Sequence, residues 1–348
     1  MRIIPFICLA LLAAAPCAAL AQTGENFELY VSNERSNDVT VIDAASQQAV
    51  ATIAAGKRPR GIHVSPDGKL VYVALSGNPI GGLHDVDAKS QDDDDDVPHD
   101  KAADGIAVID VAQRKVLRKV SVGSDPEEFD LSRAGTQFYV SNEDVKAASV
   151  VDIATGKVEH IIPVSQEPEG VATSPDGKSF YVTCEANGDI FVIDAATYRV
   201  TGQFTVPVRP RNVEFLPGTP LAIVPSESVG LLNIADTGSL KVIKTLTLPK
   251  GSRPMRVRVA PDGQRVYISE GRAGTVDVLD AHSYALLDTV KVGTRPWGLV
   301  LSPDGKYLYT ANGPSNDVSV VDLKTDKEIA RIKAGQSPWG LTVVPKGH

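Results

Sequence analysis

The sequence contains little cysteine and methionine, with 3 Cys and 2 Met among 348 residues. Two of the cysteines, Cys8 and Cys17, fall in the apolar N-terminal segment, so Cys184 is the only cysteine in the rest of the chain. A single cysteine excludes an internal disulfide, a c-type haem attachment motif and a cysteine-rich zinc site. We expect Cys184 to be a buried strand residue rather than a reactive thiol.

Basic residues are outnumbered, with 35 Lys plus Arg against 43 Asp plus Glu and a net charge of −8. Affinity for DNA or RNA comes mostly from Lys and Arg on phosphates, so this balance argues against nucleic-acid binding. That class stays open as an alternative, which salt-dependent binding would decide. Apolar residues make up 43% of the chain, which argues against wholesale disorder. The 29 Gly and 23 Pro predict many turns and few long helices.

The first 21 residues have the three parts of a secretory signal peptide. Arg2 supplies a positive charge, residues 3–15 are an apolar stretch, and residues 19–21 form a small-x-small cleavage site. A membrane anchor is the alternative, but the stretch is shorter than the ~20 residues needed to span a bilayer. A lipoprotein site at Cys17 is disfavoured by the proline before it. We predict a cleaved signal, a single mature domain over residues 22–348 and a periplasmic location.

A repeat runs through this predicted mature chain. A proline opens each unit, and successive prolines are 42 or 44 residues apart except for one interval of 67. The seven prolines are Pro59, Pro126, Pro168, Pro210, Pro254, Pro296 and Pro338. A second marker, the residue that ends a Val-Ile-Asp-like strand, also occurs seven times: Asp43, Asp110, Asp152, Asp194, Asn233, Asp280 and Asp322. Both series therefore count seven units with one insertion in the same interval.

Each unit contains the pattern of four short strands. After Pro296, apolar and β-branched residues occupy 298–302, 307–310, 318–321 and 329–332, and turn residues separate them. Four antiparallel strands in a unit of about 40 residues are the signature of a β-propeller blade. The sequence therefore predicts an all-β, seven-bladed propeller of four-stranded antiparallel blades.

The two ends of the repeat array predict how the ring closes. The last unit stops after its first strand, at residues 341–344, and the predicted mature chain begins with a second strand at residues 29–32. Pairing these N- and C-terminal strands would complete one blade and remove an open edge. An open solenoid is the alternative, but it would need capping units. In the closed ring, the first strand of each unit lies innermost, beside the central channel.

The insertion spans about residues 76–104 and includes five consecutive aspartates at 92–96. Carboxylates in this number suit Ca²⁺ or another hard cation. The spacing does not follow a regular Ca²⁺-binding loop, and a run of like charge is usually solvated. We therefore expect a solvated loop and assign no metal ligands.

The tetrapeptides at 30–33 and 139–142 read Tyr-Val-Ser-Asn, and residues 181–183 read Tyr-Val-Thr. Followed by Val-x-Val-Ile-Asp strands and Pro-Asp-Gly turns, they resemble the YVTN family of β-propeller repeats over essentially the whole mature chain. The unit around residues 216–233 departs from this pattern. Seven such repeats with an insertion in the second are similar to the β-propeller proteins associated with PQQ-dependent alcohol catabolism. This resemblance implies a periplasmic quinoprotein dehydrogenase or transport component as partner, but no defined reaction.

Charged residues and both tryptophans of the chain flank the repeat prolines. If the ring closes as predicted, these residues surround one mouth of the channel. A solvated rim of mixed charge explains the charges, and a ligand-binding mouth, which the two tryptophans at one repeat position suggest, is the equal alternative. The predicted mouth residues are Arg58, Arg60, Glu127, Glu128, Glu167, Glu169, Arg209, Arg211, Arg253, Arg256, Arg295, Trp297 and Trp339. Arg pairs with carboxylates and Trp stacks on planar rings, so the mouth would suit PQQ, a planar polycarboxylate, or an acidic loop of a protein partner.

A second set of polar residues recurs in the innermost strands. Alternation places five of them at equivalent positions facing the channel: His63, Asp130, Glu214, Arg258 and Thr342. A water-filled tunnel explains them, and a site formed by the first four is the more specific hypothesis.

The chain has no Gly-x-Ser-x-Gly, His-Glu-x-x-His or phosphate-binding loop. We therefore expect a non-catalytic accessory or binding protein, although a fold alone does not decide activity. An enzyme of the lactone-hydrolase or quinone-cofactor-dependent type remains the alternative.

Overall fold

The structure is a computed structural model that describes residues 26–80 and 98–347. The predicted signal peptide and the aspartate run of the predicted insertion lie outside the described residues. Within the described residues, no helix has the length and apolar character needed to cross a membrane.

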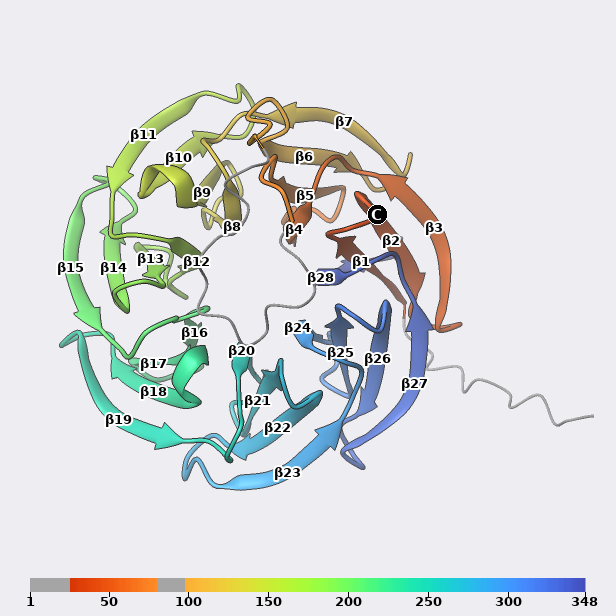
Figure 1. The fold of residues 1–348 in the computed structure, drawn as a ribbon, viewed down its shortest axis with the longest axis vertical. Helices are drawn as coiled ribbons and strands as arrows, with labels where there is room; N and C mark the ends of the chain where they lie inside the picture. The colour runs from red at the N-terminus through yellow and green to blue at the C-terminus, as the bar shows by residue number, and fades with distance from the viewer. Residues whose placement is uncertain (1–25, 81–97, 348) are drawn as a thin grey trace, which may run out of the picture.

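The described strands form seven four-stranded antiparallel sheets arranged around a central axis (Figure 1). This confirms the predicted seven-bladed β-propeller. The innermost strands are β4 (Pro59–Val64), β8 (Pro126–Leu131), β12 (Pro168–Thr173), β16 (Glu214–Phe215), β20 (Pro254–Val259), β24 (Pro296–Leu301) and β28 (Pro338–Pro345). The second strands are β5 (Leu70–Leu75), β9 (Gln137–Asn142), β13 (Ser179–Cys184), β17 (Leu221–Ser226), β21 (Arg265–Glu270), β25 (Tyr307–Asn312) and β1 (Phe27–Asn33).

The third and fourth strands complete each blade in chain order. The third strands are β6 (Gly105–Asp110), β10 (Ala147–Asp152), β14 (Asp189–Asp194), β18 (Leu231–Asp236), β22 (Thr275–Asp280), β26 (Asp317–Asp322) and β2 (Asp38–Asp43). The outermost strands are β7 (Lys115–Val120), β11 (Val158–Pro163), β15 (Val200–Thr205), β19 (Lys241–Thr247), β23 (Leu286–Lys291), β27 (Lys327–Lys333) and β3 (Gln48–Ala54). Two 3₁₀ turns, η1 (Glu143–Val145) and η2 (Glu227–Val229), connect second to third strands.

The ring closes through the two ends of the chain, as predicted. Strand β28 pairs antiparallel with β1, with Leu341 opposite Val31 and Val343 opposite Leu29. The Ser32 hydroxyl also accepts a hydrogen bond from the Gly340 amide at 3.0 Å. The open-solenoid alternative is therefore wrong.

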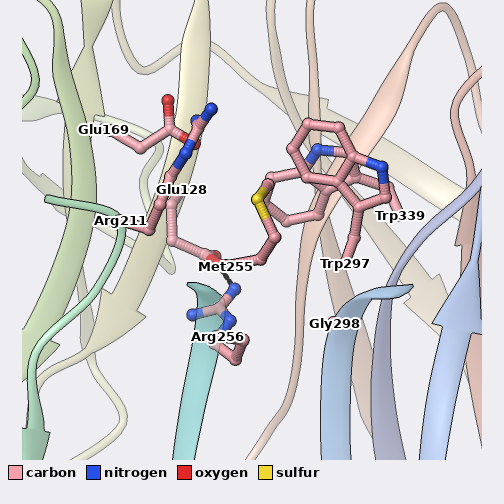
Figure 2. A pocket seen from close by; sticks show the side chains of 8 residues that line it. All are labelled: Glu128, Glu169, Arg211, Met255, Arg256, Trp297, Gly298 and Trp339. Carbon is pink, nitrogen blue, oxygen red and sulfur yellow. Dashed lines mark hydrogen bonds and ion pairs between the residues drawn. The ribbon is translucent and has the colours of Figure 1, made fainter. Parts of the chain in front are cut away.

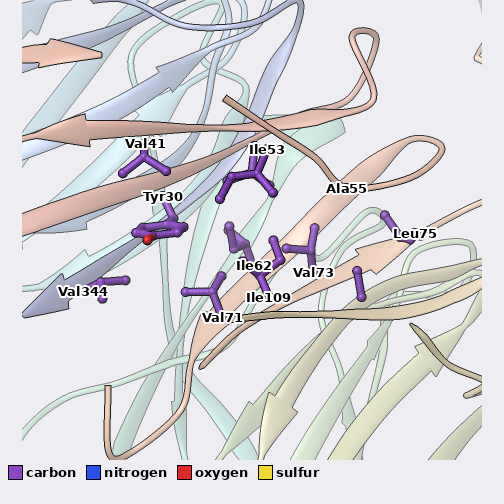
Figure 3. Packing of buried hydrophobic residues seen from close by; sticks show 12 residues of the cluster. Tyr30, Val41, Ile53, Ala55, Ile62, Val71, Val73, Leu75, Ile109 and Val344 are labelled. Carbon is purple, nitrogen blue, oxygen red and sulfur yellow. The ribbon is translucent and has the colours of Figure 1, made fainter. Parts of the chain in front are cut away.

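The hydrophobic core lies between neighbouring blades. Figure 3 shows one such layer, in which Tyr30 and Val41 of the closing blade pack near Ile62 and Val71 of the next blade. These strands read as nearly continuous apolar runs because both faces of each blade are covered. Burying each Val or Ile contributes about 1.5–3 kcal/mol. Cys184 is fully buried, as predicted, and burial raises the pKa of its thiol to about 12.

A bulge at the start of the innermost strands sets the geometry of the channel. In β4, Pro59 lies opposite Leu75 but Ile62 lies opposite Val73, so one extra residue enters the strand after the proline. Strands β8, β12, β20 and β24 shift in the same way. A bulge changes the direction of the side chains beside it. In six units, the residue before the proline also has a positive φ: Arg58, Asp125, Glu167, Arg209, Arg295 and Ser337.

Candidate functional site

The residues around the repeat prolines converge on a cavity of about 640 Å³ at one mouth of the channel. Ten of the thirteen predicted mouth residues line it: Arg58, Arg60, Glu127, Glu167, Glu169, Arg209, Arg211, Arg295, Trp297 and Trp339. The positive φ before six of the prolines and the bulge in most of the innermost strands help to place these side chains there.

The other three predicted mouth residues do not line this cavity. Glu128 and Arg256 lie deeper, where they form an ion pair across the channel between β8 and β20 (Figure 2). Burial alone would raise the pKa of Glu128, but Arg256 and His63 lower this pKa to about 2. Arg253 instead donates to the backbone carbonyl of Ser228 in η2. It is also the one residue before a repeat proline that lacks the positive φ.

Two stacked indoles form the floor of the cavity, and Met255 lies beside them in a smaller pocket that both indoles also line (Figure 2). The ring centroids of Trp297 and Trp339 are 6.1 Å apart, with 26° between the ring planes. Trp339 is only 8% exposed, so this tryptophan is packed more deeply than a rim position predicts. Arg295 lies over Trp297 at 4.7 Å from the ring centroid, a cation–π distance.

Most arginines of the wall are paired with glutamates. Arg211 contacts Glu169 at 3.1 Å and both Glu185 and Glu227 at 2.5 Å. Arg209 lies 2.9 Å from Glu185. Burial lowers the pKa of Arg211, but the three glutamates outweigh it and hold the pKa well above the ordinary value. Charged groups with fixed partners give the wall a defined shape and an alternating charge pattern.

On the neighbouring part of the wall, Arg60 and Arg58 are also paired with glutamates. Arg58 donates to Glu34 at 2.9 Å, and Arg60 contacts both Glu34 and Glu127. Burial alone would raise the pKa of Glu34, but the charges of Arg60 and Arg58 lower this pKa below its ordinary value.

An acidic sector faces this network. Asp125, Glu127 and Glu143 offer carboxylate oxygens that all lie within 4.8 Å of one another. Burial, together with the charge of Asp125, raises the pKa of Glu143 to about 8, so this carboxyl group carries a proton at neutral pH. Oxygens of this kind are the ligands that hard cations prefer, so these three residues form a group that could hold a metal ion within the part of the chain that the structure describes.

Residues from the described part of the insertion adjoin the acidic sector. His99 lies 2.9 Å from both Asp104 and Asp144. Burial opposes protonation, but Asp104 and Asp144 together raise the pKa of His99. The insertion therefore contributes at its base to the mouth, a role that the sequence pattern did not predict.

The predicted channel residues occupy equivalent positions in their blades and have different contacts. His63, Asp130 and Arg258 lie opposite Tyr72, Tyr139 and Tyr267 in their blades, as the repeat predicts. Glu214 and Thr342 lie opposite Ile223 and Tyr30.

These channel residues make contacts with different neighbours. The His63 ring is 3.1 Å from Glu128, and Arg258 pairs with Glu214 at 2.8 Å. Asp130 accepts a hydrogen bond from the backbone of Thr173. Of these contacts, only the one between Arg258 and Glu214 joins two of the four residues, and a site made jointly by His63, Asp130, Glu214 and Arg258 stays a prediction.

The model of the choice-of-anchor I domain matches residues 17–211, more than half of the chain. The chain belongs to the choice-of-anchor I family. A second model, of the seven-bladed β-propeller lactonases, matches residues 168–336. That range contains Arg209, Arg211, Arg295 and Trp297 of the mouth, so the matched region includes much of the cavity wall.

Solved structures share this fold at low sequence identity. The hydrazine synthase of Kuenenia stuttgartiensis has 22% identity and a TM-score of 0.69, over 86% of this chain and 93% of that one. Two further structures, both of proteins assigned as 6-phosphogluconolactonases without proof of activity, are each 17% identical to this chain. The one from Bacteroides fragilis has a TM-score of 0.73 over 95% and 100% of the two chains, and the one from Bacteroides uniformis 0.72 over 91% and 99%. No curated protein sequence matches the chain.

Sequence reasoning missed four glutamates of the mouth: Glu34, Glu143, Glu185 and Glu227. Each directly follows the second strand of its blade, and its amide donates to the carbonyl of the residue before the repeat proline. Glu143, Glu185 and Glu227 are 42 residues apart, so the repeat itself carried the signal. Reading the residue after each second strand would have found them.

Proposed function

We propose that this choice-of-anchor I protein is a non-catalytic binding propeller of the periplasm, and that its mouth cavity holds a small planar carboxylate. The observation that carries the proposal is the cavity of about 640 Å³ with arginines in its wall and stacked indoles in its floor. Small-molecule sites commonly measure about 300–1,000 Å³ and combine aromatic surface with a few convergent polar groups.

PQQ is the ligand we favour. It is a planar polycarboxylate, so its ring could lie against the floor while its carboxylates face the arginines. The resemblance to YVTN repeats, and to the propeller proteins associated with PQQ-dependent alcohol catabolism, supports this choice. The same resemblance and the signal-like N-terminus support a role beside a periplasmic quinoprotein dehydrogenase or a transport component.

Intrinsic fluorescence tests this proposal, because Trp297 and Trp339 are the only tryptophans of the chain and both lie in the cavity floor. PQQ should quench their emission in a saturable way after correction for absorption by the quinone. Arg211→Gln should weaken binding by at least about tenfold, because it leaves Glu169, Glu185 and Glu227 without their shared counter-ion in the wall of a cavity that would hold an anionic ligand. Lys324→Gln, at a cleft lined by Pro261 and Pro303, is the control and should change nothing. Saturable binding that survives Arg211→Gln, or no binding at all, would contradict the proposal.

A lactone hydrolase is the second candidate, because the lactonase model matches residues 168–336. The protonated Glu143 could act as a general acid in the mouth, where a pKa of about 8 is close to the working pH. Ring opening of a gluconolactone that is lost in Glu143→Gln would favour this function over binding alone.

A further inference from the structure

We propose that Arg295 is the subsite that binds the carboxylate of the ligand, which makes the favoured ligand class a planar ring bearing an anionic group. This inference rests on the proposed ligand site in the mouth. It comes from comparing the same position in different blades.

Arg295 differs from the other arginines that line the cavity. Within residues 26–80 and 98–347, its guanidinium has no carboxylate within ion-pair distance and donates no side-chain hydrogen bond. By contrast, Arg58 is paired with Glu34, and Arg209 with Glu185. Arg295 therefore has its donors available in a cavity where Arg58 and Arg209 are held by glutamates.

The repeat explains why Arg295 is unpaired. An arginine before a repeat proline can be paired by the residue after the second strand of its own blade or of the preceding blade. For Arg209 these two residues are Glu227 and Glu185, and both contact it. For Arg295 the same positions are Gly313 and Gly271, which have no side chain to pair with it.

The two glycines also make room for the aromatic floor. A Cβ at Gly313 would lie 3.3 Å from the indole nitrogen of Trp297, and one at Gly271 would lie 2.8 Å from the Met255 side chain. One face of the Arg295 guanidinium is thus held over the Trp297 ring, at 4.7 Å, while its N–H edges stay available. A planar fork of donors in this arrangement matches a carboxylate in a bidentate geometry.

The charge balance points the same way. Burial lowers the pKa of Arg295, while the pKa of Arg211 is held high by its glutamates. A partly buried cation with no described carboxylate at ion-pair distance favours an anionic ligand, because the carboxylate of the ligand can take that place. The acidic sector across the cavity would repel a second anionic group placed at Asp125, so the carboxylate end has one preferred position.

Isothermal titration calorimetry with 2-naphthoate and its neutral isostere 2-naphthamide tests this inference on the full mature protein. We expect the amide to bind at least about tenfold more weakly than the carboxylate, and Arg295→Gln to lose a similar factor for naphthoate. Gly313→Glu restores the repeat's own counter-ion beside Arg295 and should reduce binding equally. Gly313→Ala adds the same Cβ beside the Trp297 ring without the charge and should lose clearly less affinity than Gly313→Glu. Arg253→Gln, at the same repeat position outside the cavity, should also leave binding unchanged.

Equal binding of the two probes, or wild-type affinity in Arg295→Gln, would overturn the inference. Failure of naphthoate to bind the wild type would overturn it as well. A parallel titration with PQQ separates the two proposals. Arg295-dependent binding of naphthoate without PQQ binding leaves the subsite standing and removes the favoured ligand, whereas PQQ binding that is insensitive to Arg295→Gln does the reverse.

Discussion

Deletion of residues 341–348 is expected to lower the free energy of unfolding by more than about 5 kcal/mol, because it removes two buried core side chains that each contribute about 2–5 kcal/mol. These are Leu341, 5% exposed, and Val344, 1% exposed. The deletion also removes most of β28, which leaves the channel-side edge of β1 without most of its backbone partners, while its pairing with β2 stays. Urea unfolding followed by circular dichroism measures the change.

Leu341→Ala is the matched control for this deletion. It removes one side chain but keeps the β1–β28 backbone pairing, so it should cost only about 2–5 kcal/mol. A truncated protein as stable as the wild type would show that the ring does not depend on this closure. Equal losses in the truncation and in Leu341→Ala would show that strand pairing contributes nothing.

Glu270→Asn is expected to stabilise the protein by roughly 3 kcal/mol at pH 8. Glu270 is 1% exposed, and its Oε1 has no hydrogen-bond partner. In three other blades the equivalent residue is Asn33, Asn142 or Asn312, whose side-chain amide donates to a hydroxyl on the third strand at 2.9 Å. The blade of Glu270 has a second buried carboxylate, Asp277, in place of that hydroxyl. An asparagine would therefore supply the donor that this pair lacks.

The pH dependence of this effect follows from the titration of Glu270. Burial and the charge of Asp277 raise its pKa from 4.5 to about 8. The unfolded chain releases this proton near the ordinary value, whereas the folded protein keeps it. Protonated Glu270 therefore gives the protein its full stability below about pH 4.5. As pH rises toward 8, the free energy of unfolding falls, because the unfolded chain has already released this proton.

Urea midpoints at pH 5 and pH 8 check this prediction. The midpoint of Glu270→Asn should lie well above that of the wild type at pH 8 and close to it at pH 5, with the same slope at each pH. Glu159→Asn, at an exposed position, should match the wild type within about 0.5 kcal/mol at both. A gain of equal size at both pH values would mean that burial of an ionisable group is not its cause.

The architecture was predictable because it repeats. Each blade needs the same turns and the same apolar runs, so markers such as Pro296 and Asp322 recur at a fixed spacing and define the strands between them. The closure between β1 and β28 followed from where the pattern starts and stops, because an incomplete blade at each end can be completed only by the other.

The site was less predictable because it depends on differences between repeats. Arg253 and Arg295 share one repeat position, yet a carbonyl of η2 binds the first, and the second lies over Trp297. Glu128 follows Glu127 directly, but the bulge sends it deeper, to Arg256 on the far side of the channel. The Glu128–Arg256 pair joins two blades that are distant in sequence, so the residues around either member do not predict its partner.

A crystal structure of the protein with PQQ is the most direct test of the central claim, that a planar carboxylate binds in the mouth. We predict density for the quinone in the cavity, with a carboxylate at the guanidinium of Arg295 and the ring system above Trp297. Density for PQQ only outside this cavity, or an unchanged mouth in crystals grown with saturating PQQ, would contradict the account.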